Sequence, residues 1–202
     1  MRQVVLATRN AGKVLELRRI LDAAGLEIEL IGMDAFPDVP DVVESGATFI
    51  DNALLKARAV YEATGLVTVA DDSGLVVDAL NGMPGVLSAR WAGRHGDDRA
   101  NLDLVLGQLS DVPDERRGAA FICAAAAVGP DGGEAVAEGL MEGSLIREPR
   151  GSNGFGYDPI FVPYGYDLTT AQLSDAAKDA ISHRGEAFRA MAPLLAELLA
   201  RA

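Results

Sequence analysis

The chain has 202 residues, a length that suits one domain or two lobes around a shared core, and its formal net charge is −12. Apolar residues make up 49% and charged residues 24%, proportions that disfavour intrinsic disorder. The acidic balance repels polyanions, so nucleic acid is not expected as the main partner. A small anionic ligand remains compatible with this charge if the carboxylates hold a divalent metal. We therefore treat residues 1–202 as one domain.

The only cysteine, Cys123, lies in the apolar run 121–128 and is expected to pack as a small hydrophobe. No apolar run approaches the ~20 residues that span a bilayer. The first ten residues also lack the apolar core of a signal peptide. We therefore expect a cytoplasmic protein with no membrane partner.

Apolar spacing predicts alternating strands and helices in the first part of the chain. The elements expected there are a strand at 4–7, a helix at 12–24, a strand at 27–31, a loop at 37–43 and a helix that starts after an N-cap at Thr48. Two apolar strands at 66–70 and 75–80 follow, separated by Asp71-Asp72-Ser73-Gly74.

The second part of the chain contains the expected elements of a hairpin and a terminal helix. They are a helix at 99–109, strands at 119–128 and 134–140 joined by a turn at 130–133, a glycine-rich loop at 151–156, a strand at 157–162 and a helix at 186–199. The order β-α-β-α-β-β-α-β-β-loop-β-α-α predicts an α/β fold with a mixed sheet.

A first candidate site is the segment Thr8-Arg9-Asn10-Ala11-Gly12-Lys13 between the first strand and the first helix. Free N–H groups and the positive end of the helix dipole suit a phosphate there, and Lys13 adds a charge. The segment lacks the first glycine and the hydroxyl of a nucleotide P-loop. Alone, it fits an anion site or an ordinary turn equally well.

A second candidate is the pair Asp71-Asp72, whose side chains should point to opposite faces of a strand. Capping of loop N–H groups explains one carboxylate, whereas Mg²⁺ coordination beside Glu44 is the sharper interpretation of the other. Asn52 and Lys56 share a helix face near this pair. Lys56 either meets an anion or extends along the apolar face to water.

Two further segments are ambiguous by themselves. The loop from Gly151 to Asp158 suits stacking of Phe155 on a planar ring and hydrogen bonding to the ring edge, or a flexible turn with a core phenylalanine. The segment Ser182-His183-Arg184-Gly185, with Lys178 before it, is either a site or a basic helix start in solvent. Only one other histidine exists, so no zinc pair is indicated.

Together these segments resemble the inosine triphosphate pyrophosphatase family, whose members hydrolyse ITP, dITP and XTP to the monophosphate and pyrophosphate. The resemblance covers nearly the whole chain. It rests on VVLATRNAGK at 4–13, ESGATFIDNALLKA at 44–57, ADDSGLVVDALNGMPGVLSARWAG at 70–93, GFGYDPIFVP at 154–163 and SHRGEAF at 182–188.

The resemblance implies a role for each of these residues. Triphosphate binding falls to Thr8, Arg9, Asn10, Ala11, Gly12, Lys13 and Lys56; Mg²⁺ binding to Glu44 and Asp72; activation of water to Asp72; a substrate contact to Ser73; and the base and sugar to Phe155, Gly156, Tyr157, Asp158, Lys178, His183 and Arg184. It also implies a homodimer and an elongated α/β fold, with a mixed sheet, flanking helices and two lobes around a central substrate cleft.

The chain departs from the family pattern at two loops. Arg9 stands where glycine often follows the threonine, so it is either a phosphate contact or a solvent-facing side chain. Ser152-Asn153 replaces a common Thr-Gly pair, and Asn153 is expected to adopt the positive φ that glycine would supply. Two rival functions stay open: a Maf-type pyrophosphatase for pyrimidine or modified nucleotides, and a non-catalytic nucleotide-binding module.

Overall fold

A computed structural model describes residues 2–201 and, at Ala11, the backbone alone. The strands are β1 (Arg2–Leu6), β2 (Ile28–Gly32), β3 (Thr68–Val77), β4 (Gly118–Val128), β5 (Glu134–Leu145) and β6 (Phe161–Pro163). The helices are α1 (Ala11–Ala23), α2 (Phe49–Thr64), α3 (Asp98–Gln108), α4 (Asp175–Ile181) and α5 (His183–Arg201), with short 3₁₀ helices between them.

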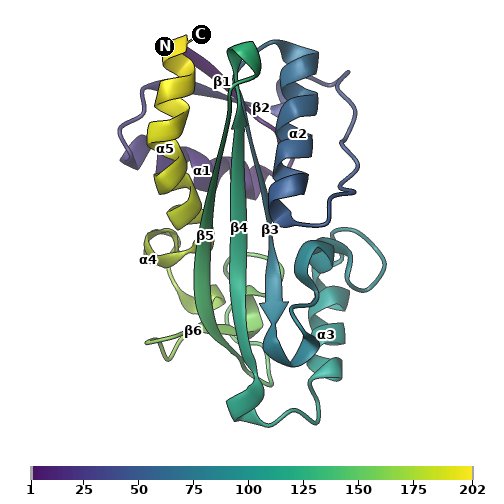
Figure 1. The fold of residues 1–202 in the computed structure, drawn as a ribbon. Helices are drawn as coiled ribbons and strands as arrows, with labels where there is room; N and C mark the ends of the chain where they lie inside the picture. Colours follow the sequence, from purple (N-terminus) through teal and green to yellow (C-terminus); the bar gives the residue numbers. More distant parts are fainter. Residues whose placement is uncertain (1, 202) are drawn as a thin grey trace. The chain divides into compact units, whose positions relative to one another are not determined.

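The described strands form one sheet in the order β2-β1-β3-β4-β5-β6. Strand β1 pairs in parallel with β2 and β3, whereas β5 and β6 are antiparallel. Figure 1 shows β3, β4 and β5 side by side. The expected α/β class with a mixed sheet and flanking helices is confirmed.

The described chain divides into two compact units, with boundaries inside β3, β4 and β5 and between α4 and α5. The first unit comprises the chain up to Asp72, Cys123–Gly139 and the chain from His183 on. The second comprises Ser73–Ile122 and Leu140–Ser182. Each unit has its own apolar cluster.

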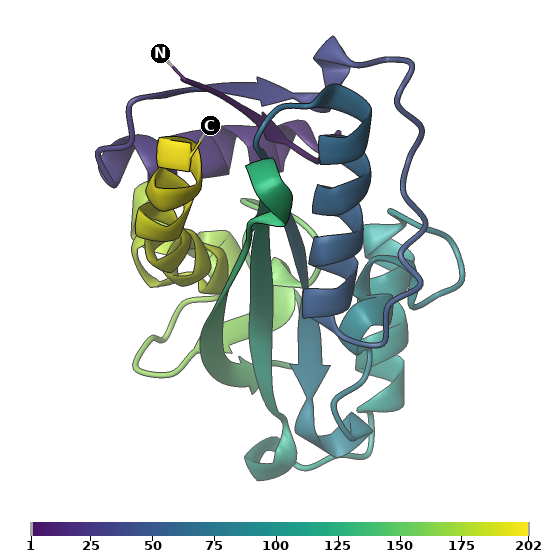
Figure 2. The same ribbon diagram turned by 45° about the horizontal axis from the view of Figure 1, so that its top comes forward.

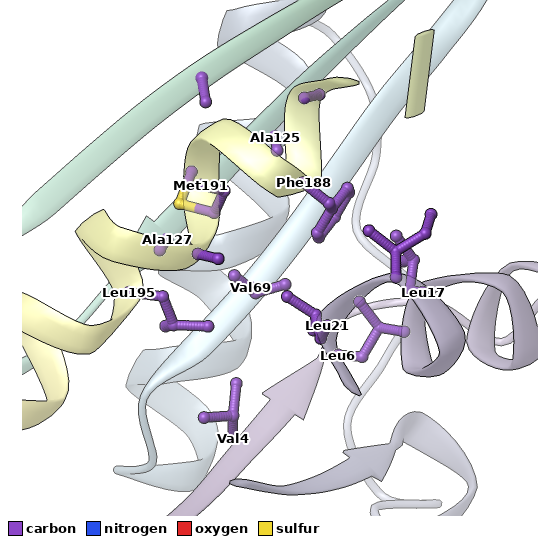
Figure 3. Close-up of a cluster of buried hydrophobic side chains, with 14 of the residues drawn as sticks. Val4, Leu6, Leu17, Leu21, Val69, Ala125, Ala127, Phe188, Met191 and Leu195 are labelled. Atoms are coloured by element: carbon purple, nitrogen blue, oxygen red, sulfur yellow. The ribbon is translucent and has the colours of Figure 1, made fainter. Parts of the chain in front are cut away.

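In the first unit, helices cover both faces of the strands. One face packs against α1 and α5, which lie together in Figure 2. Figure 3 shows Phe188, Met191 and Leu195 of α5 beside Val69 and Ala125. The other face of β1 presents Val5 to Val60 of α2 and to Met33. The two faces follow from the alternation of side chains along β1 and β3.

The second unit is built around another apolar cluster, formed by side chains of β3, α3, β4, β5, β6 and the segments between them. Its buried members are Leu75, Val77, Leu102, Val105, Leu109, Ala119, Phe121, Met141, Leu145, Tyr157, Ile160 and Phe161. The buried Arg117 guanidinium donates to the carbonyl oxygens of Leu109, Leu145 and Ile146. Backbone groups beside this cluster are therefore satisfied by a side chain.

The expectation of two strands around the aspartates was wrong, because β3 continues from Thr68 to Val77 through Asp71 and Asp72. Side chains from other elements pair with these carboxylates, so the strand needs no break there. Strand β5 also extends beyond the expected end at residue 140 to Leu145. Among residues 2–201, no helix is both long and apolar enough to cross a membrane.

Candidate functional site

The phosphate-loop candidate leads directly into the first turn of α1. Asn10 is the N-cap, and its side-chain oxygen accepts a hydrogen bond from the Lys13 backbone N–H at 3.2 Å. The Thr8 hydroxyl oxygen accepts from the Asn10 N–H at 3.2 Å. The first turn carries no acidic residue, so no carboxylate there competes for the positive end of the helix dipole. Thr8 and Asn10 therefore shape a helix start that suits an anion.

Lys13 and Arg184 meet at the buried carboxylate of Asp71. The Asp71 Oδ2 atom lies 2.9 Å from Lys13 Nζ and 3.4 Å from Arg184 Nε. Arg184 NH1 also donates to Glu16 Oε2 at 2.7 Å. Burial alone would raise the Asp71 pKa, but Lys13 and Arg184 outweigh it and hold that pKa well below its usual range. Asp71 is therefore an ionised link between α1, β3 and α5.

Asp72 points to the opposite face of β3, where α2 supplies its partners. Asn52 Nδ2 donates to Asp72 Oδ2 at 3.0 Å, and Lys56 Nζ lies 3.6 Å from Asp72 Oδ1. The same Lys56 ammonium lies 2.6 Å from Glu44 Oε1. The Lys56 ammonium lies between these acids with its side chain 13% exposed, so the alternative in which it extends to water is wrong.

The pKa values around Asp72 reflect this crowded, buried arrangement. Burial raises the pKa of the Asp72 carboxyl, and Glu44 adds to the rise while Lys56 and Asn52 oppose it. Burial would lower the Lys56 pKa, but Asp72, Asp71 and Glu44 more than compensate and raise it. A carboxylate with a raised pKa is a better proton acceptor than one in open water.

Glu44 and Asp72 fit a Mg²⁺ site because one cation, the Lys56 ammonium, already lies within ion-pair distance of both carboxylates. Among residues 2–201, no three His, Cys, Asp or Glu side chains gather as a complete metal-binding group. Mg²⁺ commonly takes one or two carboxylates and completes its shell with waters and substrate phosphates. Glu44 and Asp72 are therefore the residues that would hold such an ion, with waters and substrate phosphates as its other ligands.

The second unit contains the glycine-rich loop, which is held by Asp158. The Asp158 Oδ2 atom accepts from the Phe155 N–H at 2.9 Å and from Lys178 Nζ at 2.5 Å. The Thr170 hydroxyl donates to the other Asp158 oxygen at 2.8 Å. Lys178 Nζ also lies 5.4 Å from the centre of the Phe155 ring, which is partly exposed. Phe155 therefore has a fixed backbone and an accessible ring face suited to stacking.

Gly156, Tyr157 and Asn153 of this loop each have a different hydrogen-bond partner. The Gly156 N–H donates to Asp98 Oδ2 of α3 at 2.9 Å. Tyr157 is buried, and its hydroxyl donates to the Ser88 carbonyl at 2.8 Å. Asn153 does not adopt a positive φ; Gly151, Gly154 and Gly156 do, and the Asn153 amide donates to the Leu173 carbonyl. The expectation for Asn153 was therefore wrong, because the glycines around it make the turn.

The remaining candidates lie on β3, on α1 and the loop before it, and at the start of α5. His183 and Arg184 begin α5 and are buried, so the alternative of a basic segment in solvent is wrong. Ser73 follows Asp72 in β3 and is half-buried. Gly12 lies in the first turn of α1, and only the backbone of Ala11 is described. Arg9 is directed toward residues 33–41, where it contacts backbone carbonyls and Asp41.

Sequence reasoning did not assign Glu16 or Asp98 to the site, and it noted Asn52 without a role. It named Asp71 within the candidate pair, but not its ion pairs with Lys13 and Arg184. Helical spacing offered a signal for Glu16, which lies three residues after Lys13 on α1. No comparable signal linked Asp98 to Gly156, because that contact depends on how α3 packs against the loop.

A model of the Ham1 family matches residues 4–194. This chain belongs to the Ham1 family. The dITP/XTP pyrophosphatase of Streptomyces coelicolor is 61% identical to this Ham1 chain over 199 residues, which cover 98% of the chain and 100% of the relative. The dITP/XTP pyrophosphatase of Mycobacterium tuberculosis is 58% identical over 197 residues, covering 97% and 96%.

Solved structures of Ham1-type proteins share this fold. A crystal structure of a nucleoside-triphosphatase, dITP/XTP pyrophosphatase, from Mycobacterium abscessus matches with a TM-score of 0.77 and 57% identity, covering 96% of this chain and 98% of that one. A HAM1 protein from Coxiella burnetii matches with a TM-score of 0.87 and 43% identity, covering 98% and 100%. The family resemblance inferred from the five sequence blocks is confirmed.

Proposed function

We propose that this Ham1-family protein is a nucleoside-triphosphate pyrophosphatase that converts dITP, ITP and XTP to the monophosphate and pyrophosphate. The observation that carries the proposal is the convergence of Glu44 and Asp72 on Lys56, in a chain that aligns end to end with dITP/XTP pyrophosphatases. Two converging carboxylates and a lysine suit hydrolysis of a charged phosphoanhydride. The reaction removes aberrant purine nucleotides from the precursor pool.

The first unit supplies groups for the triphosphate and for the attacking water. The start of α1 and the ammonium groups of Lys13 and Lys56 offset negative charge on the phosphates and on the pyrophosphate that leaves. Asp72 accepts a proton from the water that attacks the α-phosphorus, a role that suits its raised pKa. Mg²⁺ held by Glu44 and Asp72 would neutralise phosphate charge and orient the substrate. Asn52 fixes the Asp72 carboxylate while this happens.

Base selection is assigned to the partly exposed ring of Phe155, which stacks on the purine, and to cationic donors. Hypoxanthine and xanthine present a carbonyl oxygen where adenine presents an amino group, so donors favour the 6-oxo purines. The guanidinium of Arg184 is a planar group of N–H donors, and Glu16 and Asp71 accept from two of its nitrogens and so orient it. We assign Arg184 as a donor to the 6-oxo group, with His183 and Lys178 beside the base and sugar.

The test is a screen of product release across nucleoside triphosphates, with and without MgCl₂. We expect Mg²⁺-dependent release of pyrophosphate from dITP, ITP and XTP, with little from ATP. Orthophosphate as the first product would contradict the proposal. Nucleotide binding without turnover would instead identify a sensing module, and preference for pyrimidine nucleotides would identify a Maf-type enzyme.

The homodimeric state and the cytoplasmic location remain predictions drawn from the resemblance and the sequence. Light scattering of the purified protein tests the first, and cell fractionation tests the second. A monomer with full dITP turnover would show that the site needs no second subunit.

A further inference from the structure

Arg9 occupies the position at which this chain departs from the family pattern, and its guanidinium is engaged by another segment. Nε donates to Asp41 Oδ1 at 2.8 Å, NH1 to the Met33 carbonyl at 3.3 Å and NH2 to the Val39 carbonyl at 2.7 Å. Each nitrogen thus has an acceptor within residues 33–41. The planar fork of arginine suits this arrangement, which the ammonium of lysine does not reproduce.

The segment that Arg9 holds leads to Glu44. Residues 33–48 connect β2 to α2 and carry Pro37 and Pro40. Beyond Glu44, the segment is attached to α2, because the Gly46 N–H donates to Asn52 at 2.7 Å and Lys56 pairs with Glu44. On the other side of Glu44, Phe36 and Val39 pack against the cluster of Val5, Met33 and Val60, and Arg9 supplies the polar attachment.

The short distance along the chain between Asp41 and Glu44 links the Arg9 contacts to the position of the Glu44 carboxylate. Asp41 precedes Glu44 by three residues, and three residues reach roughly 10 Å even when fully extended. Release of Asp41 and Val39 from Arg9 would therefore enlarge the range of positions open to Glu44. Asp72 would not move with it, because Asp72 lies in β3 and is held by Asn52.

We propose that Arg9 is a positioning residue that holds segment 33–41 so that Glu44 stays aligned with Asp72 for Mg²⁺. The inference rests on the proposed function, because that function makes Glu44 a metal ligand. Residues that orient metal ligands typically change metal affinity by ~10 to 100-fold when mutated. The Arg9 side chain is 37% exposed, so we expect its loss to weaken Mg²⁺ affinity by about tenfold, the lower end of that range.

Arg147 in the second unit provides a matched control. Its Nε donates to Asp114 Oδ1 at 2.9 Å, its NH1 to the Ser110 carbonyl at 3.2 Å and its NH2 to the Val112 carbonyl at 3.0 Å. This is the same combination of one carboxylate and two carbonyls, on a segment without candidate metal ligands. Arg147→Gln therefore reports the general cost of losing such contacts.

The experiment compares wild type, Arg9→Gln, Arg9→Lys and Arg147→Gln in two measurements. The first is pyrophosphate release from dITP across a MgCl₂ titration, which gives the Mg²⁺ concentration at half-maximal rate. The second is amide hydrogen exchange of residues 36–45 without metal or nucleotide. We expect Arg9→Gln to raise the half-maximal Mg²⁺ concentration about tenfold and to accelerate exchange, with Arg9→Lys close to Arg9→Gln and Arg147→Gln close to wild type.

The outcomes separate this inference from the proposed function. Unchanged Mg²⁺ dependence in Arg9→Gln overturns the inference, whether or not exchange accelerates. A fall in rate that excess Mg²⁺ does not relieve, with unchanged exchange, also overturns it and assigns Arg9 to the phosphates. If wild type releases no pyrophosphate, the proposed function fails, and the part of the inference concerning Glu44 as a ligand fails with it.

Discussion

Substitution of each of the two adjacent aspartates by asparagine is expected to affect a different property of the protein. Both changes keep the size of the side chain and remove its charge. Asp71 serves Lys13 and Arg184 on one face of β3, whereas Asp72 serves Asn52 and Lys56 on the other. Asp71→Asn should therefore lower stability, and Asp72→Asn should lower turnover.

The magnitudes follow from the partners. Removing one member of a buried ion pair typically costs about 3–5 kcal/mol, and Asp71 is fully buried with Arg184 beside it. For a chain of this size each kcal/mol shifts Tm by roughly 2–4 °C, so we expect a fall of roughly 6–20 °C. Burial already disfavours the ionised form of Asp72, so Asp72→Asn should change Tm little. Loss of a general base lowers the rate by ~10² to 10⁴-fold.

The assay pairs thermal unfolding with pyrophosphate release from dITP for wild type and both variants. Turnover is measured well below the unfolding temperature of the least stable variant, so that unfolding does not mimic catalytic loss. Asp71→Asn should retain considerably more activity than Asp72→Asn. The comparison is internally controlled because the two residues are neighbours in one strand.

The reasoning is refuted if the two variants behave alike. A large Tm loss with near-normal turnover in Asp72→Asn would make that carboxylate structural. Loss of turnover in Asp71→Asn without loss of Tm would place Asp71 in the chemistry, with the ion pairs to Lys13 and Arg184 contributing little to stability.

Three further outcomes are expected. The Asp71 pKa is held below its unfolded value near 3.8, so the ionised carboxylate adds to the free energy of unfolding above that pH, and this contribution is lost as pH falls below it. The difference in free energy of unfolding between wild type and Asp71→Asn, measured with denaturant, should therefore narrow from about pH 6 to about pH 3. Gly154 has φ +74° and an added Cβ would overlap the Asp158 carboxylate, so Gly154→Ala should cost about 1–3 kcal/mol and raise KM for dITP, whereas an unchanged KM would separate the loop from the base. Arg184→Lys cannot reproduce the contacts to both Glu16 and Asp71 and should narrow the preference for ITP over ATP by roughly tenfold in kcat/KM, whereas equal losses for both substrates would assign Arg184 to the fold.

Much of the local structure was predictable because it depends on near neighbours in the chain. Thr48 caps α2 through a reciprocal contact with Asp51, as its position before an apolar helix indicated. Helical periodicity also placed Asn52 and Lys56 on one face, and both meet Asp72. The extent of β3 was not predictable, because two adjacent carboxylates inside a strand are stable only with distant partners.

Sequence alone determined which chemical groups the protein carries, the approximate elements that hold them and the family to which the five blocks point. Tertiary structure decided which groups meet: Lys13 reaches Asp71 across 58 residues, and Arg184 reaches it across 113. It also placed the Arg9 guanidinium on residues 33–41. The physical reason is that a local pattern specifies which face of a helix or strand is apolar, whereas the neighbour on that face depends on strand order, here with β3 beside β1 and α5 packed against α1.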